Sequence, residues 1–396
     1  MDIQQQRERL ASLVKGVLAV RPLVDALKQP VCVVPVGNGS ASGYVPEGSP
    51  PAVETFINRI SERTCAPRFR LDFDPRRQSV FETVVSNRLG LGHDLVVSDA
   101  LFKYPAADEV IEQTVSVDFD RQFFRGRARS FDGALLRCYT AGSHQRKTVV
   151  LVAACGMPAK LCERWMRFLA KDYFVITWES RLLFESSPNG HELAYDVSAQ
   201  VADLFAVMDH FNVRESHLMG LCGGAVIAVS AAAGEPGRIT SLSLWHGDYE
   251  LGPHCPKTKH QKDLKALMAA IAAGKSQAEN IHKMFSQNIL KNFPPDLAHF
   301  VLYPYANPDL LFLYGRSNGK IMETDVTPLL SRVTQPVLVV TSRDDNTAHP
   351  EGSKFVAGRL PRAQLLVENH GDHLALFDAA PNVTEAAAQF LAAQEI

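Results

Sequence analysis

The segment HLMGLCGGAVIAVSAA, residues 217–232, constrains the fold more strongly than any other part of the chain. A short apolar run ends at Gly220, Cys222 follows, and Gly223 and Gly224 lead into a run of small residues. This G-x-C-x-G pattern predicts a strained turn between a strand and a helix, because small residues on either side let the two backbones pass closely. The turn would place the thiol at a helix N-terminus, where the dipole and free N–H groups favour a thiolate. The alternative interpretation is a tight turn that carries a buried core cysteine.

Strand-like and helix-like segments alternate on both sides of this turn. Continuous apolar, β-branched runs predict buried strands, and amphipathic or alanine-rich runs predict the helices between them. After a hairpin that begins near residue 115, the expected strands are 148–155, 173–181, 216–220, 240–247, 336–342 and 363–369. Strands that alternate with helices require crossover connections, so the pattern predicts an α/β fold with a mostly parallel sheet.

The length of 396 residues fits one large domain with insertions or two domains. We expect an α/β core at 113–248 and 331–396, and an extension or small domain at 1–112 whose role the sequence does not explain. The alternation stops at 249–330, where helical patterns predict a cap or lid. Such an insertion would cover the carboxyl edge of the sheet, where α/β active sites lie.

Composition excludes several classes of function. The net charge of −2 and the pI of about 6.7 argue against general binding of nucleic acids or anionic membranes, which requires a basic surplus. The polar start of the chain does not resemble a signal peptide, and no apolar run is long enough for a transmembrane helix. Seven irregularly spaced cysteines without a C-x-x-C pair predict neither a disulfide framework nor a zinc site. We therefore expect a cytoplasmic protein with no metal and no resident cofactor.

A nucleophilic cysteine requires a base and an acid that orients the base, and in this type of scaffold both follow it in sequence, the acid first. The segment VLVVTSRDDNTAHP offers Asp345 as the acid, with Asp344 as the alternative. Asp248, after the strand that ends in WHG, is a more distant candidate. The segment LLVENHGDHLALFD offers His373 as the base, and His370 as a loop residue or a supporting partner.

Acyl transfer also requires donors for the oxyanion that develops on the substrate. The backbone N–H of Gly223 is one expected donor. The second is expected from the loop after VVLVAA, from the N–H of Cys155 or Gly156, while the Cys155 thiol is expected to have no chemical role.

With these residues in place, the chain resembles α/β-hydrolase-fold proteins over about 115–396. The segments ACGMP, FVITWESR, GLCGG, SRDDNTAHP and NHGDHLAL fall where that superfamily keeps its oxyanion loop, fourth strand, elbow, acid and histidine. Three groups with a cysteine elbow are similar: polyhydroxyalkanoate synthases, dienelactone hydrolases, and the aminoacyltransferases that shuttle an aminoacyl group between carrier proteins in syringomycin and coronamic acid assembly. The length, the polar N-terminal extension, ACGMP and GLCGG most resemble the third group. His349 is an extra residue relative to the acid loop of the synthases, and it leaves the choice between the two aspartates open.

The resemblance implies transfer of a thioester-bound group between phosphopantetheine carrier proteins, or from acyl-CoA, through an acyl-enzyme on Cys222. A cysteine suits that chemistry, because exchange of one thioester for another is nearly isoenergetic, whereas a serine would form a more stable oxyester. The alternatives are a thioester or lactone hydrolase, a synthase that polymerises hydroxyacyl-CoA, and a non-catalytic scaffold. A basic segment of the expected cap offers a docking surface for an acidic carrier protein, although an ordinary solvated face is the simpler interpretation of its lysines, which are Lys257, Lys259, Lys262 and Lys265.

Overall fold

The computed structural model describes residues 2–34, 50–72, 78–91, 104–185, 193–288 and 296–394. The chain forms two compact units, Met1–Gln122 with Glu279–Leu311, and Phe123–Ala278 with Phe312–Ile396. The N-terminal unit therefore ends about ten residues later than the sequence suggested, and the expected cap at 249–330 is shared between both units. In the described part of the chain, no helix is long and apolar enough to cross a bilayer.

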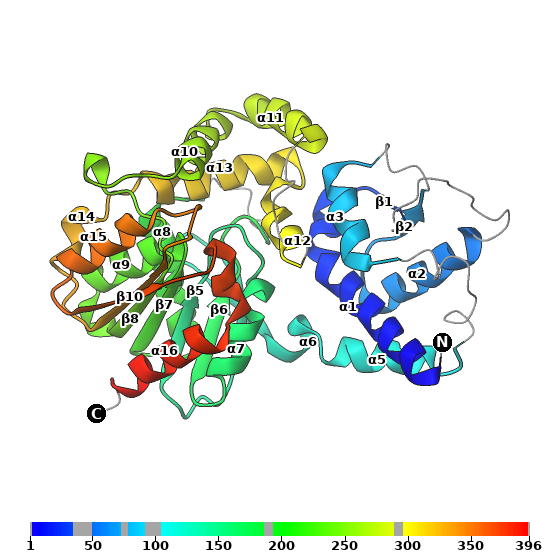
Figure 1. Ribbon diagram of the computed structural model, residues 1–396, viewed down its shortest axis with the longest axis horizontal. Coiled ribbons are helices and arrows are strands. Elements are labelled where there is room, and N and C mark those ends of the chain that lie inside the picture. The colour runs from blue at the N-terminus through cyan, green and yellow to red at the C-terminus, as the bar shows by residue number, and fades with distance from the viewer. Residues whose placement is uncertain are drawn as a thin grey trace. The chain divides into compact units, whose positions relative to one another are not determined.

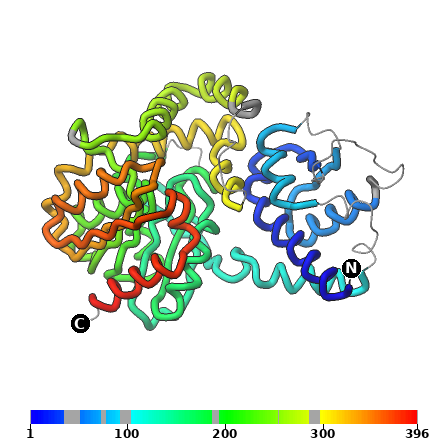
Figure 2. The backbone as a smooth tube through the Cα atoms, in the orientation of Figure 1, coloured from blue at the N-terminus to red at the C-terminus, as the bar shows by residue number. Residues whose placement is uncertain are grey.

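The N-terminal unit is mainly helical and is built around one long helix, α1 (Ile3–Leu27). Asp2 and Gln5 form a reciprocal capping box that fixes the start of α1, and its buried side packs against α2, α3, α5 and α12 (Figure 2). Two short parallel strands pair beside these helices. The elements are β1 (Val31–Val33), α2 (Pro50–Thr64), β2 (Phe69–Leu71), α3 (Val80–Leu89), α5 (Ala107–Ser116), α6 (Phe119–Phe123), α12 (Ala298–Val301) and η5 (Tyr303–Tyr305).

The second unit contains an eight-stranded sheet with the order β10-β9-β8-β7-β5-β6-β4-β3. The strands from β10 to β6 are parallel, and β4 and β3 join antiparallel at one edge. The strands are β3 (Phe124–Arg129), β4 (Leu135–Ala141), β5 (Thr148–Val152), β6 (Phe174–Trp178), β7 (Ser216–Leu221), β8 (Ile239–Trp245), β9 (Val337–Ser342) and β10 (Ala363–Glu368). The strands expected from the β-branched runs are therefore present, each within a few residues of its expected bounds.

Helices lie on both faces of this sheet, as Figure 1 shows for its central strands. They are η2 (Ala159–Cys162), α7 (Glu163–Leu169), α8 (Val197–His210), α9 (Gly224–Gly234), η3 (Pro236–Arg238), α15 (Pro350–Arg359), η6 (His373–Asp378) and α16 (Pro381–Ala392). β6, β7 and β9 are buried along their whole length, which explains why their sequences are continuous apolar runs rather than alternating ones.

Additional helices are inserted between β8 and β9, where the sequence predicted helical structure. They are η4 (Gly252–His254), α10 (Lys259–Ala272), α11 (Lys275–Asn288), α13 (Pro308–Glu323) and α14 (Thr327–Leu330). The boundary between the units falls within α11 and within α13. The C-terminal half of α13 reaches the elbow, because a Cβ atom on Gly223 would lie 3.3 Å from Ile321 Cγ2 and 3.9 Å from Asn318 Oδ1.

Candidate active site

Cys222 occupies the turn between β7 and α9 in a left-handed backbone conformation, with φ of 54°. No side chain fits at the two flanking glycines. A Cβ atom on Gly220 would lie 2.7 Å from Ala225 Cα, and one on Gly224 would lie 2.1 Å from the carbonyl oxygen of Val152. Strand and helix therefore approach as closely as the G-x-C-x-G pattern predicted. The cysteine is half-buried.

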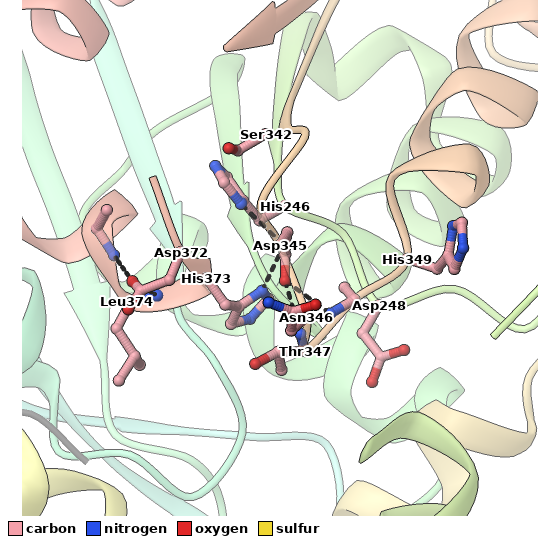
Figure 3. A network of polar contacts seen from close by, with 12 residues as sticks. His246, Asp248, Ser342, Asp345, Asn346, Thr347, His349, Asp372, His373 and Leu374 are labelled. Carbon is pink, nitrogen blue, oxygen red and sulfur yellow. Dashed lines mark hydrogen bonds and ion pairs between the residues drawn. The ribbon is translucent and has the colours of Figure 1, made fainter. Parts of the chain in front are cut away.

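Asp345, in the loop after β9, has a fully buried side chain whose two oxygens are both held by hydrogen bonds. Oδ1 accepts the backbone N–H groups of Thr347 and Ala348, both at 2.9 Å. Oδ2 lies 2.9 Å from His373 Nδ1 and 2.9 Å from His246 Nδ1, as Figure 3 shows. Burial opposes ionisation, but the hydrogen bonds from both imidazoles outweigh it and hold the pKa of Asp345 below its usual value. The site therefore contains an ionised carboxylate shared by two imidazoles.

His373 begins the 3-10 helix η6, and local structure holds its loop in place. The preceding Asp372 caps the helix by accepting the N–H groups of Leu374 and Ala375, and Trp165 Nε1 donates to the carbonyl of Leu376 at 2.6 Å. Burial disfavours the charged imidazole, but attraction to Cys222 and to Asp345 outweighs it and raises the pKa of His373 well above its usual value. Within the described residues its buried Nε2 has no conventional hydrogen bond, and it is the nitrogen left to act on the neighbouring sulfur.

The structure separates the two candidate acids. Asp344 has a side chain that is 56% exposed, and its Oδ2 lies 3.2 Å from Nδ1 of the exposed His370. Asp345, one residue later, points into the protein toward His373. The geometry therefore brings together Cys222, His373 and Asp345, and leaves Asp344 and His370 as a surface pair.

Gly223 and the loop after β5 lie where oxyanion donors were expected. Gly224 touches Val152 and Ala153, so the elbow packs directly against the end of β5. The Gly156 N–H donates to Ser180 Oγ at 3.0 Å, which corrects the expectation that it is free for a substrate. Neither the Cys155 nor the Gly223 N–H has an acceptor among the described residues.

The Cys155 thiol is buried close to the elbow. Burial, with a smaller contribution from Cys222, raises its pKa to about 12 despite a hydrogen bond with Ser180. The thiol therefore stays protonated at neutral pH and is a poor nucleophile.

His246, immediately after β8, was missed as a site residue. It is 1% exposed, has φ of 48°, and places Nε2 3.8 Å from Glu368 Oε2 on its far side. Burial lowers its pKa, but the hydrogen bond to Asp345 and the attraction of the Glu368 carboxylate outweigh this and raise it. β8 and β9 are neighbours in the sheet, so a polar residue directly after β8 is expected close to Asp345, which follows β9. This placement is the signal that could have identified His246.

Donor atoms of His246, Asp345 and His373 lie within 4.8 Å of one another, a spacing that a metal ion could also use. The direct contacts of 2.9 Å between Oδ2 and each Nδ1 are hydrogen-bond distances, and they leave no room for an ion between the carboxylate and either ring. We therefore interpret the group as a hydrogen-bond network.

The basic segment of the insertion is largely paired within the chain. Lys257 and Lys265 both form ion pairs with Glu250, and Lys259 forms one with Asp263. Burial opposes ionisation of Glu250, but the two lysines lower its pKa to about 2. These pairs favour the simpler interpretation of a solvated, internally neutralised face.

Comparisons with known proteins agree with this architecture. The family model described as TAP-like protein matches residues 318–396, which include the candidate acid and histidine. Over 233 residues, the chain is 24% identical to RutD of Stutzerimonas stutzeri, which is named as a carbamate hydrolase; the match covers 57% of this chain and 84% of that one. Over 237 residues, it is 22% identical to the L-allo-isoleucyltransferase of Pseudomonas savastanoi pv. glycinea, covering 58% of this chain and 80% of the relative.

Solved structures match about two thirds of the chain. The enol-lactonase of Burkholderia xenovorans LB400 superposes with a TM-score of 0.55 at 18% identity, covering 67% of this chain and 99% of that one. A hydrolase from Pseudomonas aeruginosa PA01 gives a TM-score of 0.52 at 21% identity, covering 67% and 97%. The mostly parallel sheet, the elbow and these matches show that the chain has the α/β-hydrolase fold.

Proposed function

We propose that this protein transfers an aminoacyl group from one phosphopantetheine thioester to another through a covalent intermediate on Cys222. The observation that carries the proposal is a cysteine at the elbow, beside a buried histidine whose other nitrogen is held by an ionised carboxylate. Support for transfer also comes from the relative named as an L-allo-isoleucyltransferase. The phosphopantetheine would arrive on a carrier protein, or as coenzyme A, and not as a resident cofactor.

In the first half of the proposed cycle, His373 takes the proton of the Cys222 thiol, and the sulfur attacks the thioester carbonyl. The carbonyl oxygen becomes an oxyanion that can accept the N–H groups of Gly223 and Cys155, which have no acceptor within the described residues. When the intermediate collapses, the carbon–sulfur bond to the donor breaks. The donor thiol then leaves with the proton from His373, and the group remains on Cys222 as a thioester.

The second half runs the same steps with an acceptor thiol. His373 removes its proton, the acceptor sulfur attacks the acyl-enzyme, and Cys222 recovers the proton. Both halves exchange one thioester for another, so the cycle is reversible and nearly isoenergetic. An oxyester on a serine would lie lower in free energy, and return to a thiol would then be uphill.

The second candidate is hydrolysis, favoured by the RutD matches, which cover 84% of that relative. The two candidates share every step up to the acyl-enzyme and differ in whether water or a thiol resolves it. A thioester hydrolase would release free acid without needing an acceptor.

The test uses a holo carrier protein loaded with a labelled isoleucyl thioester, a second holo carrier, and the full-length enzyme. Intact mass follows every protein for wild type, Cys222→Ala and Cys222→Ser. Label on the wild-type enzyme and then on the second carrier, absent with Cys222→Ala, would support the shuttle. The serine variant should accumulate the label as an oxyester and pass it on poorly. Free acid with no label on the second carrier would instead support the hydrolase.

A further inference from the structure

We infer that Asp248 is the ammonium-binding group of the acyl site, so that the site prefers thioesters that carry a free α-amino group. This inference rests on the proposed function and specifies its substrate class. The α-ammonium of an aminoacyl group is only two bonds from the carbonyl carbon. A carboxylate that recognises it must therefore lie in the immediate surroundings of Cys222 and His373.

Asp248 lies in those surroundings. Its backbone N–H donates to the carbonyl of Cys222 at 3.4 Å, which ties the segment after β8 to the elbow. Its carboxylate interacts electrostatically with His373. In Figure 3 the Asp248 carboxylate is directed away from Asp345, so it does not compete with Asp345 for the imidazole. Asp248 is thus beside the reacting groups without belonging to their hydrogen-bond chain.

A single amide fixes one oxygen of this carboxylate. Gln261 Oε1 accepts the backbone N–H groups of Thr258 at 3.0 Å and His349 at 3.1 Å, which settles the orientation of the amide. Its Nε2 therefore points to Asp248 and donates to Oδ1 at 2.7 Å. Oδ2 has neither a hydrogen bond nor an ion pair among the residues that the structure describes, and Asp248 is half-buried rather than enclosed. One oxygen is held and the other is open to a ligand.

His373 and Lys257 attract the Asp248 carboxylate, but within the described residues no cation forms an ion pair with it. Lys257 is 2.9 Å from Glu250 Oε2 and donates to the carbonyl of Tyr249. Burial lowers the pKa of His260, although Asp248 opposes the shift, so its imidazole is neutral at pH 7. Burial also raises the pKa of Asp248, and the hydrogen bond from Gln261 opposes that. A half-buried carboxylate that forms no ion pair within the described residues gains stability when a ligand places a cation in direct contact with it.

The experiment compares isoleucyl and 3-methylpentanoyl N-acetylcysteamine thioesters, which differ only in the α-ammonium. The rate constant for acylation of Cys222 is followed by intact mass under single-turnover conditions. Wild type should prefer the isoleucyl substrate by about 10- to 100-fold, the effect expected of a hydrogen bond to a charged group. N-acetylisoleucyl thioester should behave like the substrate without the amine, because acetylation removes the charge.

Asp248→Asn keeps the shape of the side chain and an oxygen that can accept the hydrogen bond from Gln261. It removes the negative charge, and should therefore reduce the preference for the isoleucyl substrate to near unity. Asp263→Asn is the matched control, because Asp263 is an exposed aspartate on the same insertion that pairs with Lys259, and it should retain the wild-type preference. Equal wild-type acylation by isoleucyl and 3-methylpentanoyl thioesters would overturn the inference and leave the proposed transfer intact. An equal fall for both substrates in Asp248→Asn would also overturn it, by assigning Asp248 to the support of His373. Acylation by none of the thioesters would instead contradict the proposed function.

Discussion

His246 offers the most direct test of how the candidate site is organised. Its Nδ1 lies 2.9 Å from the same Asp345 oxygen that holds His373, and both side chains are buried. We expect His246 to be a positioning residue that keeps Asp345 ionised and aimed at His373. His246→Leu removes the donor, whereas His246→Asn retains a neutral N–H donor at nearly the same place and tolerates the left-handed backbone at this position.

The size of the effect follows from the hydrogen bonds that remain. A hydrogen bond to a charged group contributes about 1.5–3 kcal/mol, or about 10- to 100-fold in rate if it is lost entirely in the transition state. Asp345 would still accept two backbone N–H groups and His373, so the lower end applies. We expect His246→Leu to slow acylation of Cys222 about 10-fold, and His246→Asn to stay within about threefold of wild type.

A pH profile separates positioning from general damage. Protonated His246 and His373 repel each other across Asp345. Both variants lack the His246 charge, so the pKa of His373 should be higher in them. The fall in acylation rate at high pH, which follows loss of the His373 proton, should therefore move to higher pH. The rate of Cys222 acylation, followed by intact mass from pH 5 to pH 10, measures this shift. An unchanged pH profile, or an asparagine variant as slow as the leucine variant, would refute this account of His246.

Two further predictions test the elbow and the choice of acid. Gly224→Ala should lower the free energy of unfolding by about 3 kcal/mol in urea, because the new methyl group would lie 2.1 Å from a backbone oxygen of β5. Gly234→Ala, at the open end of the same helix, has no atom within 4 Å and should be neutral or slightly stabilising; equal losses in both variants would contradict the steric argument. Asp345→Asn should reduce acylation of Cys222 by at least about 100-fold, since the carboxylate orients and stabilises the imidazolium, whereas Asp344→Asn should remain near wild type. A larger loss for Asp344→Asn would assign the acid to the neighbouring residue.

Some of this site could be predicted from local patterns, and some depended on contacts that no local pattern contains. The G-x-C-x-G pattern lies in one short stretch of sequence, so both glycines and the strained turn at Cys222 could be predicted from it, although the clash that requires Gly224 is with the distant Val152. The choice between Asp344 and Asp345 did not, because neighbouring residues of a turn point in opposite directions and only burial distinguishes them. Similarly, residues 279–311 pack with the N-terminal unit through contacts such as Asn307 Nδ2 to the carbonyl of Ala26, which lies 281 positions away.

The segment after β8 shows why the missed residues belong to the same site as the predicted ones. The chain leaves β8 beside the elbow, where the N–H groups of Cys222 and His246 donate to strand carbonyls of β8 and β9, respectively. His246 then turns toward Asp345, and Asp248 and Tyr249 interact with His373 and Cys222. The buried Tyr249 hydroxyl has no hydrogen-bond partner within the described residues.

One short segment therefore forms a hydrogen bond with the acid and interacts electrostatically with the base and the sulfur, although none of its residues belongs to the triad. An acid and a base fix how the nucleophile is activated, but they do not select the acyl group. On the proposed function, selection must come from side chains that face the carbon next to the reacting carbonyl. The segment after β8 supplies a carboxylate oxygen and a hydroxyl without hydrogen-bond partners in the described part of the chain, on side chains that interact electrostatically with His373 and Cys222. Substitutions of Asp248 and Tyr249 should therefore change which thioester is accepted before they change whether Cys222 can be acylated at all.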